Sequence, residues 1–233
     1  MPSRARGEVT CNNWSVNKSD LDRLGDRLRG GISPEDLTFL DTYRRGFRNA
    51  YDSVVDRVRA ELGLEASGRP AKSTPAIVDK LCRSSMRLTQ MQDIAGCRVV
   101  VPDIPAQERV IARLDKMFDA TVIDRRVKPS NGYRAVHVVV REVGLPVEVQ
   151  VRTDLQHVWA ESSEKLADAF GSQLKYGGGP KEIRELLDDF SKMIGDFEQH
   201  LDMGEAAGPS VSELKSKLRG AMVDLTVALR QHQ

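Results

Sequence analysis

Two acids in a stretch rich in cations are the residues of this sequence best suited to chemistry. Asp93 directly precedes the apolar run IAGCRVVV, and Glu148 lies in the run PVEVQVRT. Residues 69–152 contain 15 Lys and Arg against 9 Asp and Glu. Carboxylates hold hard divalent cations such as Mg²⁺, and guanidinium and ammonium groups bind phosphate oxygens. The combination predicts a site for a polyphosphate and a metal ion.

Glu148 lies in a strand whose spacing fits two interpretations. Alternation places Glu148, Gln150 and Arg152 on one face and the intervening valines on the other. Such a polar face belongs either to a solvent-exposed edge strand or to a site. If the CRVVV strand lies beside it, Asp93 and Glu148 can share a divalent cation among neighbouring cationic side chains. Those side chains are Arg69, Lys72, Lys80, Arg83, Arg87 and Arg98.

The segment KPSNGYRAVHVVV, residues 128–140, begins with turn residues and ends as a strand. Pro129, Asn131 and Gly132 supply the restricted and positive φ values that a turn needs. Turn chemistry does not explain an aromatic side chain and a cation directly after the turn. Tyr133 and Arg134 therefore need another explanation.

The N-terminal part is expected to be helical. A short helix is predicted near Asp20–Arg29, and SPEDL begins a second helix with Ser33 as N-cap and Pro34 in the first turn. Apolar residues from 37 to 62 recur at helical spacing and form the buried stripe of that helix. The opposite face is typical of a solvated helix and also suits a polyanion, because it carries Arg44, Arg45, Arg48, Arg57 and Arg59.

The remaining elements predict an α+β fold. After a linker at GLEASGRPAKS, the patterns indicate a mixed β-sheet of four to five strands flanked by helices, with helical extensions at both ends. Helices are expected at 75–83, 104–118, 154–170, 181–203 and from Ser210, and strands at the CRVVV run, 120–124, 133–140 and 146–151. The expected domains are an N-terminal arm and helix at 1–62, a core at 63–180 and C-terminal helices at 181–233.

Composition and cysteine usage exclude several classes of protein. Hydrophobic residues make up 40% and charged residues 30% of the 233 residues, as in ordinary globular proteins. The three cysteines are odd in number and lack metal-ligand spacing, which predicts reduced thiols in a cytoplasmic protein. No apolar run approaches the length of a membrane span, so no membrane partner is expected.

Four ordered motifs resemble the synthetase domain of the RelA/SpoT family. They are AKSTPAIVDKL, MQDIAGCRVVV, KPSNGYRAVHVVV and VEVQVRT, and the resemblance runs from about residue 69 to 176. It implies a nucleotidyltransferase-like sheet and transfer of the β,γ-pyrophosphate of ATP to a ribose 3′-hydroxyl, with Mg²⁺ as cofactor. It further implies that Asp93 binds Mg²⁺, and that Glu148 assists the metal or acts as base toward the attacking hydroxyl.

The same resemblance implies which residues contact each substrate. Lys72 and Ser73 would contact the ATP phosphates and Arg98 would stack on adenine, with Arg69 and Lys80 on the same side. Pro70 stands where the family commonly has an Arg, whose role Arg69 can take. Tyr133 would stack on the acceptor base. The other acceptor-side residues are Lys128, Asn131, Arg134, His137, Gln150 and Arg152; for His137, a core histidine fits the sequence equally well.

Two features resemble the small members of the family. The chain has no hydrolase motif of the HD type, so a small, single-domain synthetase is expected. The segment VQVRTDLQHVWAESSEKLADAF resembles toxic or phage-defence relatives, some of which modify the 3′ end of tRNA. The expected acceptors are a tRNA 3′ end or a guanosine nucleotide, GDP or GTP. An antitoxin protein and a homo-oligomer are compatible partners.

Three functions compete at this point. The first is an ATP-dependent pyrophosphokinase of the toxin type, acting on tRNA or a guanosine nucleotide. The second is an ordinary alarmone synthetase that makes ppGpp or pppGpp as a signal. The third is a nucleotide-binding regulator with a dead site; Asp93, Glu148 and Tyr133 argue against it, and Pro70 favours it.

Overall fold

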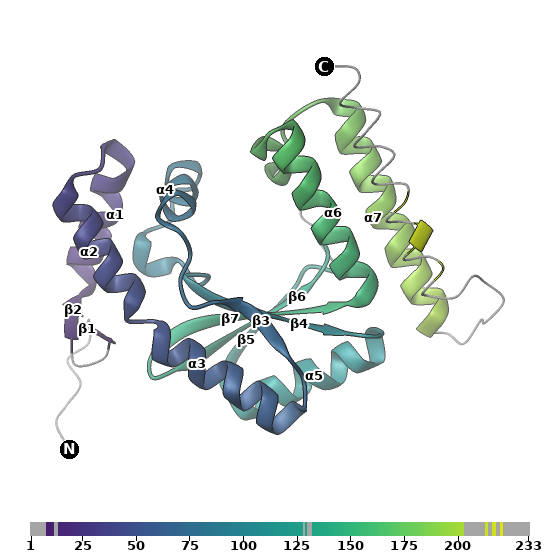
Figure 1. Cartoon of the computed structure of the whole chain (residues 1–233), viewed down its shortest axis with the longest axis horizontal. Helices are drawn as coiled ribbons and strands as arrows, with labels where there is room; N and C mark the ends of the chain where they lie inside the picture. Colours follow the sequence, from purple (N-terminus) through teal and green to yellow (C-terminus); the bar gives the residue numbers. More distant parts are fainter. Residues whose placement is uncertain are drawn as a thin grey trace. The chain divides into compact units, whose positions relative to one another are not determined.

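A five-stranded mixed sheet flanked by helices is the central feature of the chain (Figure 1), which confirms the expected α+β class. The computed structural model describes residues 8–11, 14–127, 129, 132–202 and the single positions 213, 216, 217 and 220. The sheet has the strand order β3–β4–β7–β6–β5. Its strands are β3 Ala66–Arg69, β4 Ala95–Val101, β5 Asp119–Asp124, β6 Val136–Glu142 and β7 Leu145–Thr153.

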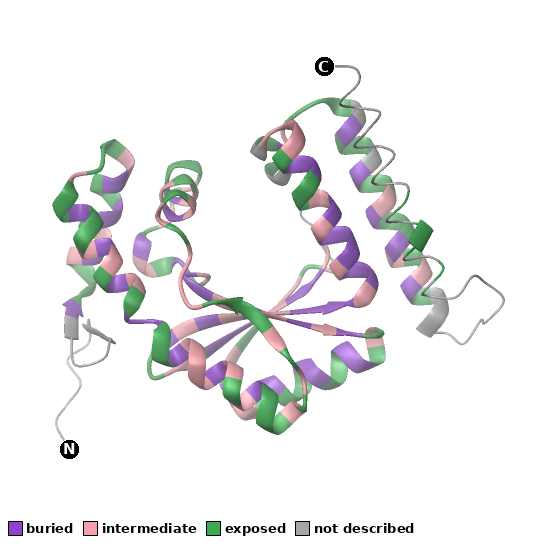
Figure 2. Cartoon of the chain, viewed as in Figure 1, coloured by how far each residue is buried: buried purple, intermediate pink, exposed green. Residues whose placement is uncertain are grey.

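Alternation along the inner strands separates an apolar face from a polar one. Val99 and Val101 of β4 and the three valines of β7 are buried, whereas Gly96, Arg98, Glu148 and Gln150 are partly exposed (Figure 2). Successive side chains of a strand point to opposite faces, so these four residues lie on the face opposite to the buried valines of their strands. Strands β6 and β7 follow one another through a two-residue turn, Val143–Gly144, in which both residues have positive φ.

The chain divides into two compact units. Each unit gathers segments that lie far apart in the sequence, and strands β4, β5, β6 and β7 contribute residues to both. The first unit is Met1–Val99, Arg113–Val122 and Val138–Gln150, and the second is Val100–Ala112, Ile123–His137 and Val151–Gln233.

The helices of the first unit form a small cluster in which α1 packs against α2 and α4 (Figure 1). Ser33 caps α2 with Pro34 in its first turn, as predicted from the sequence, and Asn17 caps α1. The elements are α1 Lys18–Gly30, α2 Pro34–Arg45, α3 Arg48–Arg57, the π-helical turn Val58–Leu62, α4 Thr74–Arg83 and the 3₁₀ turn Leu88–Gln90.

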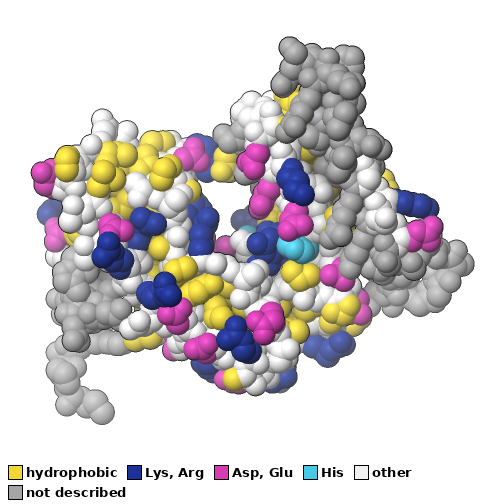
Figure 3. Space-filling model, in the orientation of Figure 1, with side chains coloured by type: hydrophobic (Ala, Val, Ile, Leu, Met, Phe, Trp, Pro, Cys, Tyr) yellow, Lys and Arg dark blue, Asp and Glu magenta, His cyan; other side chains and the backbone are white. Residues whose placement is uncertain are grey.

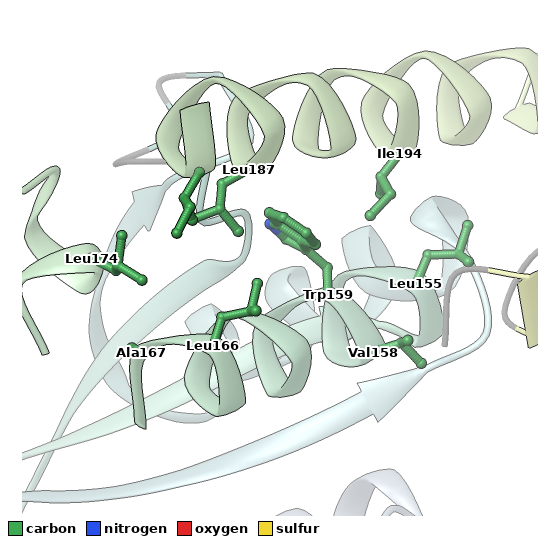
Figure 4. Close-up of a cluster of buried hydrophobic side chains, with 9 residues drawn as sticks. Leu155, Val158, Trp159, Leu166, Ala167, Leu174, Leu187 and Ile194 are labelled. Atoms are coloured by element: carbon green, nitrogen blue, oxygen red, sulfur yellow. The ribbon is translucent and has the colours of Figure 1, made fainter. Parts of the chain in front are cut away.

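The second unit is built around the packing of α6, Asp154–Phe170, against α7, Lys181–Asp202. Trp159 lies at the centre of their shared apolar cluster, between Leu166 of α6 and Leu187 of α7 (Figure 4). The Trp159 ring also stacks on Phe190, with 6.0 Å between ring centroids. Helix α5, Ile104–Met117, runs across both units, and the 3₁₀ turn Ser172–Tyr176 connects α6 to α7.

Three local expectations differ from the structure. The single helix expected over residues 34–62 breaks at Gly46, where Phe47 N–H donates to the Arg44 carbonyl in a tighter i→i+3 turn. The expected linker contains β3, because Gly68 lets the backbone approach β4: a Cβ there would lie 2.3 Å from the Gly96 oxygen. A hairpin of β1 Glu8–Cys11 and β2 Trp14–Asn17 also precedes α1.

The helix expected from Ser210 begins outside the described residues. Among the residues that are described, no helix has the length and apolar composition of a membrane span.

Candidate active site

Asp93 is held between two lysines in the first unit. The Nζ atoms of Lys72 and Lys80 each donate to one Asp93 carboxylate oxygen, both at 2.7 Å. The side chains of Lys72, Lys80 and Asp93 are only 14%, 29% and 19% exposed, so water screens these pairs weakly. Burial by itself would raise the pKa of Asp93, but the charges of Lys80 and Lys72 outweigh it and hold the pKa below its usual value.

Backbone structure explains why the three groups meet. The Lys72 N–H donates to the Ile94 carbonyl at 2.6 Å, which places Lys72 beside the residue that follows Asp93. Ser73 is the N-cap residue of α4 with Pro75 in the first turn, and Lys80 follows within the same helix. The motif AKSTPAIVDK therefore delivers two ammonium groups to one carboxylate, one from the loop after β3 and one from α4.

Arg44 of α2 supports this segment from outside the sequence motifs. Its Nε donates to the Lys72 carbonyl at 2.7 Å, and its Nη1 donates to Thr74 Oγ1 at 3.2 Å. The Arg44 side chain is 20% exposed, whereas that of neighbouring Arg45 is 80% exposed. Arg44 therefore holds the Lys72 backbone and the Thr74 side chain, on either side of Ser73.

The arginines of the expected basic stripe each form an ion pair. Arg45 lies 2.6 Å from Asp41, and Arg48 lies 3.0 Å from Asp52. The other pairs are Arg44–Asp41, Arg57–Glu61 and Arg59–Glu65. On the face shown in Figure 3, basic and acidic side chains are likewise interspersed. This pairing favours the solvated-face interpretation of the stripe over a continuous polyanion track.

A row of residues crosses three neighbouring strands at Gly96. Arg69 of β3 is paired with Gly96 of β4 in the antiparallel register, so both face the same side of the sheet. A Cβ placed on Gly96 would lie 3.5 Å from the Glu148 Cβ, so Glu148 of β7 faces that side too. Arg98 follows Gly96 by two residues on this face. The glycine lets β4 approach β7 closely, because a Cβ at this position would lie 3.1 Å from the Glu148 carbonyl oxygen.

Glu148 has a hydrogen-bond donor beside it on the same strand. Gln150 Nε2 donates to Glu148 Oε2 at 2.7 Å, which confirms the face-sharing that alternation predicted. Cys97 points to the opposite, buried side, where burial and then the charge of Glu148 raise the pKa of the thiol to about 12. At neutral pH this thiol stays protonated, so it offers no thiolate nucleophile.

The acids of this unit suit Mg²⁺ by their chemistry. In the part of the chain that the structure describes, no three His, Cys, Asp or Glu side chains gather as metal ligands. Mg²⁺ is commonly held by one or two carboxylates together with substrate phosphates, so Asp93 and Glu148 fit that mode. An ionised carboxylate has about four lone-pair sites, so Asp93 retains capacity while both lysines are bound.

Tyr133, His137 and Arg152, which were expected on the acceptor side, meet in the second unit. The Tyr133 hydroxyl lies 3.0 Å from His137 Nε2 and accepts a hydrogen bond from Arg152 Nη2 at 3.0 Å. The Arg152 guanidinium carbon lies 5.2 Å from the centroid of the Tyr133 ring, and the His137 ring meets that ring edge to face. Arg152 is buried, so a cation supports the tyrosine from within the fold.

Arg134 turns away from this group toward α7. Its Nε donates to Ser191 Oγ at 3.0 Å, and its Nη1 donates to the Arg126 carbonyl at 3.0 Å. The guanidinium lies against Gly195, where a Cβ would approach it to 2.8 Å. These contacts give Arg134 a structural role beside α7. Lys128 and Asn131, also expected on the acceptor side, lie outside the described residues.

Sequence reasoning missed Arg44 and Gly96 as parts of the site. Arg44 belongs to a helix about 30 residues before the motif that it supports, and one arginine among five on a helix face gives no signal. Gly96 could have been noted, because a glycine inside an apolar strand often marks a close approach or an open position.

Comparison with known proteins identifies related sequences. A family profile described as a region found in RelA / SpoT proteins matches residues 68–167. An uncharacterized protein of Mycobacterium tuberculosis is 31% identical over 224 residues, which cover 90% of this chain and 81% of that protein. The GTP pyrophosphokinase YjbM of Bacillus subtilis is 28% identical over 180 residues, which cover 70% of this chain and 80% of that protein.

Solved structures share the fold. The small alarmone synthetase 1 of Bacillus subtilis, in a crystal structure with its product pppGpp, has a TM-score of 0.57 and 24% identity, covering 76% of this chain and 100% of that chain. The small alarmone synthetase 2 of the same organism has a TM-score of 0.57 and 22% identity, covering 73% and 98%. At these identities the likeness concerns the fold alone.

Proposed function

Because the chain belongs to the RelA/SpoT family, we propose that it is an ATP-dependent pyrophosphokinase that transfers the β,γ-pyrophosphate of ATP to the ribose 3′-hydroxyl of a guanosine nucleotide. The observation that carries this proposal is the position of Asp93 between Lys72 and Lys80. In the same unit, Glu148 lies on a face of the sheet that it shares with Arg69 and Arg98. The likeness to the GTP pyrophosphokinase YjbM supports GDP or GTP as the acceptor.

The reaction requires alignment and charge neutralisation more than covalent chemistry. The acceptor 3′-oxygen forms a bond to the β-phosphorus of ATP, the bond from that phosphorus to the oxygen bridging it to the α-phosphorus breaks, and AMP leaves with that oxygen. Negative charge builds up on the phosphoryl oxygens during transfer. Fixed cations of the protein stabilise that charge when they are already oriented before the reaction.

The two lysines supply these cations on the donor side. In the ATP-bound protein, Lys72 and Lys80 would contact phosphate oxygens, with Ser73 at the start of α4 next to them. Arg69 and Arg98, which lie beside Gly96 and face the same side as Glu148, suit the remaining phosphate and adenine contacts. The donor site therefore keeps a guanidinium although position 70 is a proline, because the preceding residue is Arg69.

Glu148 is the base that we assign to the acceptor hydroxyl. Its carboxylate takes the proton of the 3′-hydroxyl as the oxygen attacks, and Gln150 orients it through the 2.7 Å hydrogen bond. Asp93, together with Glu148, would hold Mg²⁺. When bound, Mg²⁺ supplies charge neutralisation at the phosphate oxygens and orients them.

Tyr133 is the acceptor-side platform in this proposal. Its ring would stack on the guanine base, while Arg152 and His137 hold its hydroxyl. The tRNA acceptor and the antitoxin partner stay predictions. The arginines that would line a tRNA phosphate track pair with acids, and Arg44 is bound to the backbone near Lys72.

A product assay with an acceptor panel tests the proposal. The purified chain would be incubated with Mg²⁺, ATP labelled in the β- and γ-phosphates, and GDP, GTP or deacylated tRNA in separate reactions. We expect label in ppGpp or pppGpp. Label on tRNA and none on either nucleotide would overturn the guanosine assignment, and no label in any acceptor would contradict a pyrophosphokinase.

A further inference from the structure

A chain of buried hydrogen bonds crosses the second unit from a cation to an anion. Arg126 Nη1 donates to Gln107 Oε1 at 3.1 Å, Gln107 Nε2 donates to Gln156 Oε1 at 2.9 Å, and Gln156 Nε2 donates to Glu198 Oε2 at 3.0 Å. We call these four residues the amide relay. Both glutamines are fully buried and Glu198 is 8% exposed. Each amide accepts from one neighbour and donates to the next, so all the dipoles point the same way.

Burying the polar and charged groups of the amide relay costs free energy, because they lose their contacts with water. Burial raises the pKa of Glu198, and it outweighs the hydrogen bonds from Thr153 and Gln156 and the charges of Arg134 and Arg126. Apolar side chains of the same volume often stabilise a core at least as well as buried charges do. A fully connected polar network, by contrast, fixes one arrangement of the elements that it joins.

Helix α7 joins the relay to Arg134, the residue after Tyr133. Ser191 accepts from Arg134 Nε, and Arg134 Nη1 donates to the carbonyl of Arg126, the first residue of the relay. Ser191 and Glu198 are seven residues apart and therefore lie on the same face of α7. The Trp159 indole N–H adds a hydrogen bond to the Gly132 carbonyl at 2.8 Å.

Helix α7 and helix α5 each hold the end of β7 through one residue, Glu198 and Gln107. Thr153 Oγ1 donates to Glu198 Oε1, and Gln107 Nε2 also donates to the Val151 carbonyl at 2.7 Å. These contacts lie on either side of Arg152. Tyr133 and Arg152 thus each neighbour a residue that is hydrogen-bonded to α7, and the two side chains meet at 3.0 Å.

We propose that α7, through Ser191 and Glu198, sets the spacing between Tyr133 and Arg152 and thereby the affinity for the acceptor nucleotide. Ser191 and Glu198 are positioning residues and touch no substrate themselves. Both lie beyond residue 167, where the family match ends. The identity of the ligand rests on the proposed function, whereas the mechanical role of α7 does not.

Two measurements on the full chain test the inference. Hydrogen–deuterium exchange without nucleotide would follow segments 132–137 and 151–156, and initial rates would give KM for the acceptor and for ATP. The variants are Glu198→Ala and Ser191→Ala, with Glu198→Gln as the conservative replacement. Asp189→Ala is the matched control, because Asp189 lies on α7 with its side chain 74% exposed.

We expect Glu198→Ala and Ser191→Ala to speed exchange in both segments and to raise KM for the acceptor about tenfold, as for loss of one charge-assisted hydrogen bond. KM for ATP should stay within about twofold, because these residues hold the acceptor side only. Glu198→Gln retains an oxygen for Gln156 and should lie between Glu198→Ala and the wild type. If Glu198→Ala fails to fold, Ser191→Ala carries the same test, since it removes only a hydroxyl.

Unchanged exchange in either segment of the Glu198→Ala and Ser191→Ala variants would overturn the role of α7. Equal rises in the KM values for the acceptor and for ATP would also overturn it, as would an effect of Asp189→Ala as large as that of Glu198→Ala. A wild-type chain that transfers no pyrophosphate would contradict the proposed function instead. In that case the exchange measurement alone still decides whether α7 holds the Tyr133–Arg152 pair.

Discussion

Replacing Arg44 by alanine should weaken ATP binding although Arg44 lies outside every sequence motif. The change removes a charged donor from the Lys72 carbonyl and from Thr74 Oγ1, and so frees the backbone that directs Lys72 at Asp93. Hydrogen bonds from charged groups contribute about 1.5–3 kcal/mol. Water can replace part of this at a side chain that is 20% exposed. A net loss of about 1–2 kcal/mol corresponds to a factor of roughly 5–30.

The assay is the initial rate as a function of ATP concentration at saturating acceptor. We expect Arg44→Ala to raise KM for ATP by that factor and to leave KM for the acceptor nearly unchanged. Arg44→Lys should recover little, because an ammonium group cannot bridge both oxygens as the planar guanidinium does.

Arg45→Ala is the control for this prediction. Arg45 is the next residue of the same helix, and it pairs with Asp41 at the surface, where such pairs contribute about 0–1 kcal/mol. An Arg44→Ala variant with wild-type KM for ATP would refute the reasoning, as would an Arg45→Ala variant that is equally impaired.

Further predictions follow from the other described contacts. Asp93→Asn and Glu148→Gln should each abolish transfer at unchanged circular dichroism; wild-type turnover in either would contradict its role. Asp93→Asn should also destabilise the fold, and by less at acid pH than at neutral pH. Because the pKa of Asp93 is lowered in the fold, its carboxylate stabilises the folded state above the unfolded pKa of about 3.9 and loses this contribution as the pH falls through the folded pKa. Denaturant titrations at several pH values would check this trend. Tyr133→Phe should raise KM for the acceptor by roughly 5- to 30-fold, because it removes the hydroxyl that Arg152 binds, and an unchanged KM would mean that the ring alone matters. In variants that retain one cysteine, a thiol reagent at neutral pH should modify the exposed Cys82 and spare Cys97, and fast labelling of Cys97 would contradict its burial.

Local pattern predicted much of the fold. Helix α6 begins and ends where the helical spacing placed it, because Thr153 forms a capping box with Gln156 and Gly171 follows the last turn. The face shared by Glu148 and Gln150 followed from alternation, and their hydrogen bond agrees with it. These features depend on residues close in the sequence, so the sequence contains them directly.

Features that depend on distant contacts were not predictable. Strand β3 lies in a Gly-containing segment of low strand propensity and forms through its pairing with β4. The contact of Arg44 with the Lys72 carbonyl and the relay from Arg126 to Glu198 join residues that lie far apart in the chain. No local periodicity encodes such pairs. The residues of the candidate site could be selected by type and motif, but the groups that position them could not.

The fate of the ATP phosphates tests the central claim most directly. The purified chain would be incubated with Mg²⁺, GDP or GTP, and ATP labelled separately at the α-, β- or γ-phosphate. A pyrophosphokinase must place both the β- and the γ-label on the acceptor and release the α-label as AMP, in equal amounts. Formation of ADP with only the γ-label on the acceptor would contradict the account, because it would mean transfer of a single phosphoryl group.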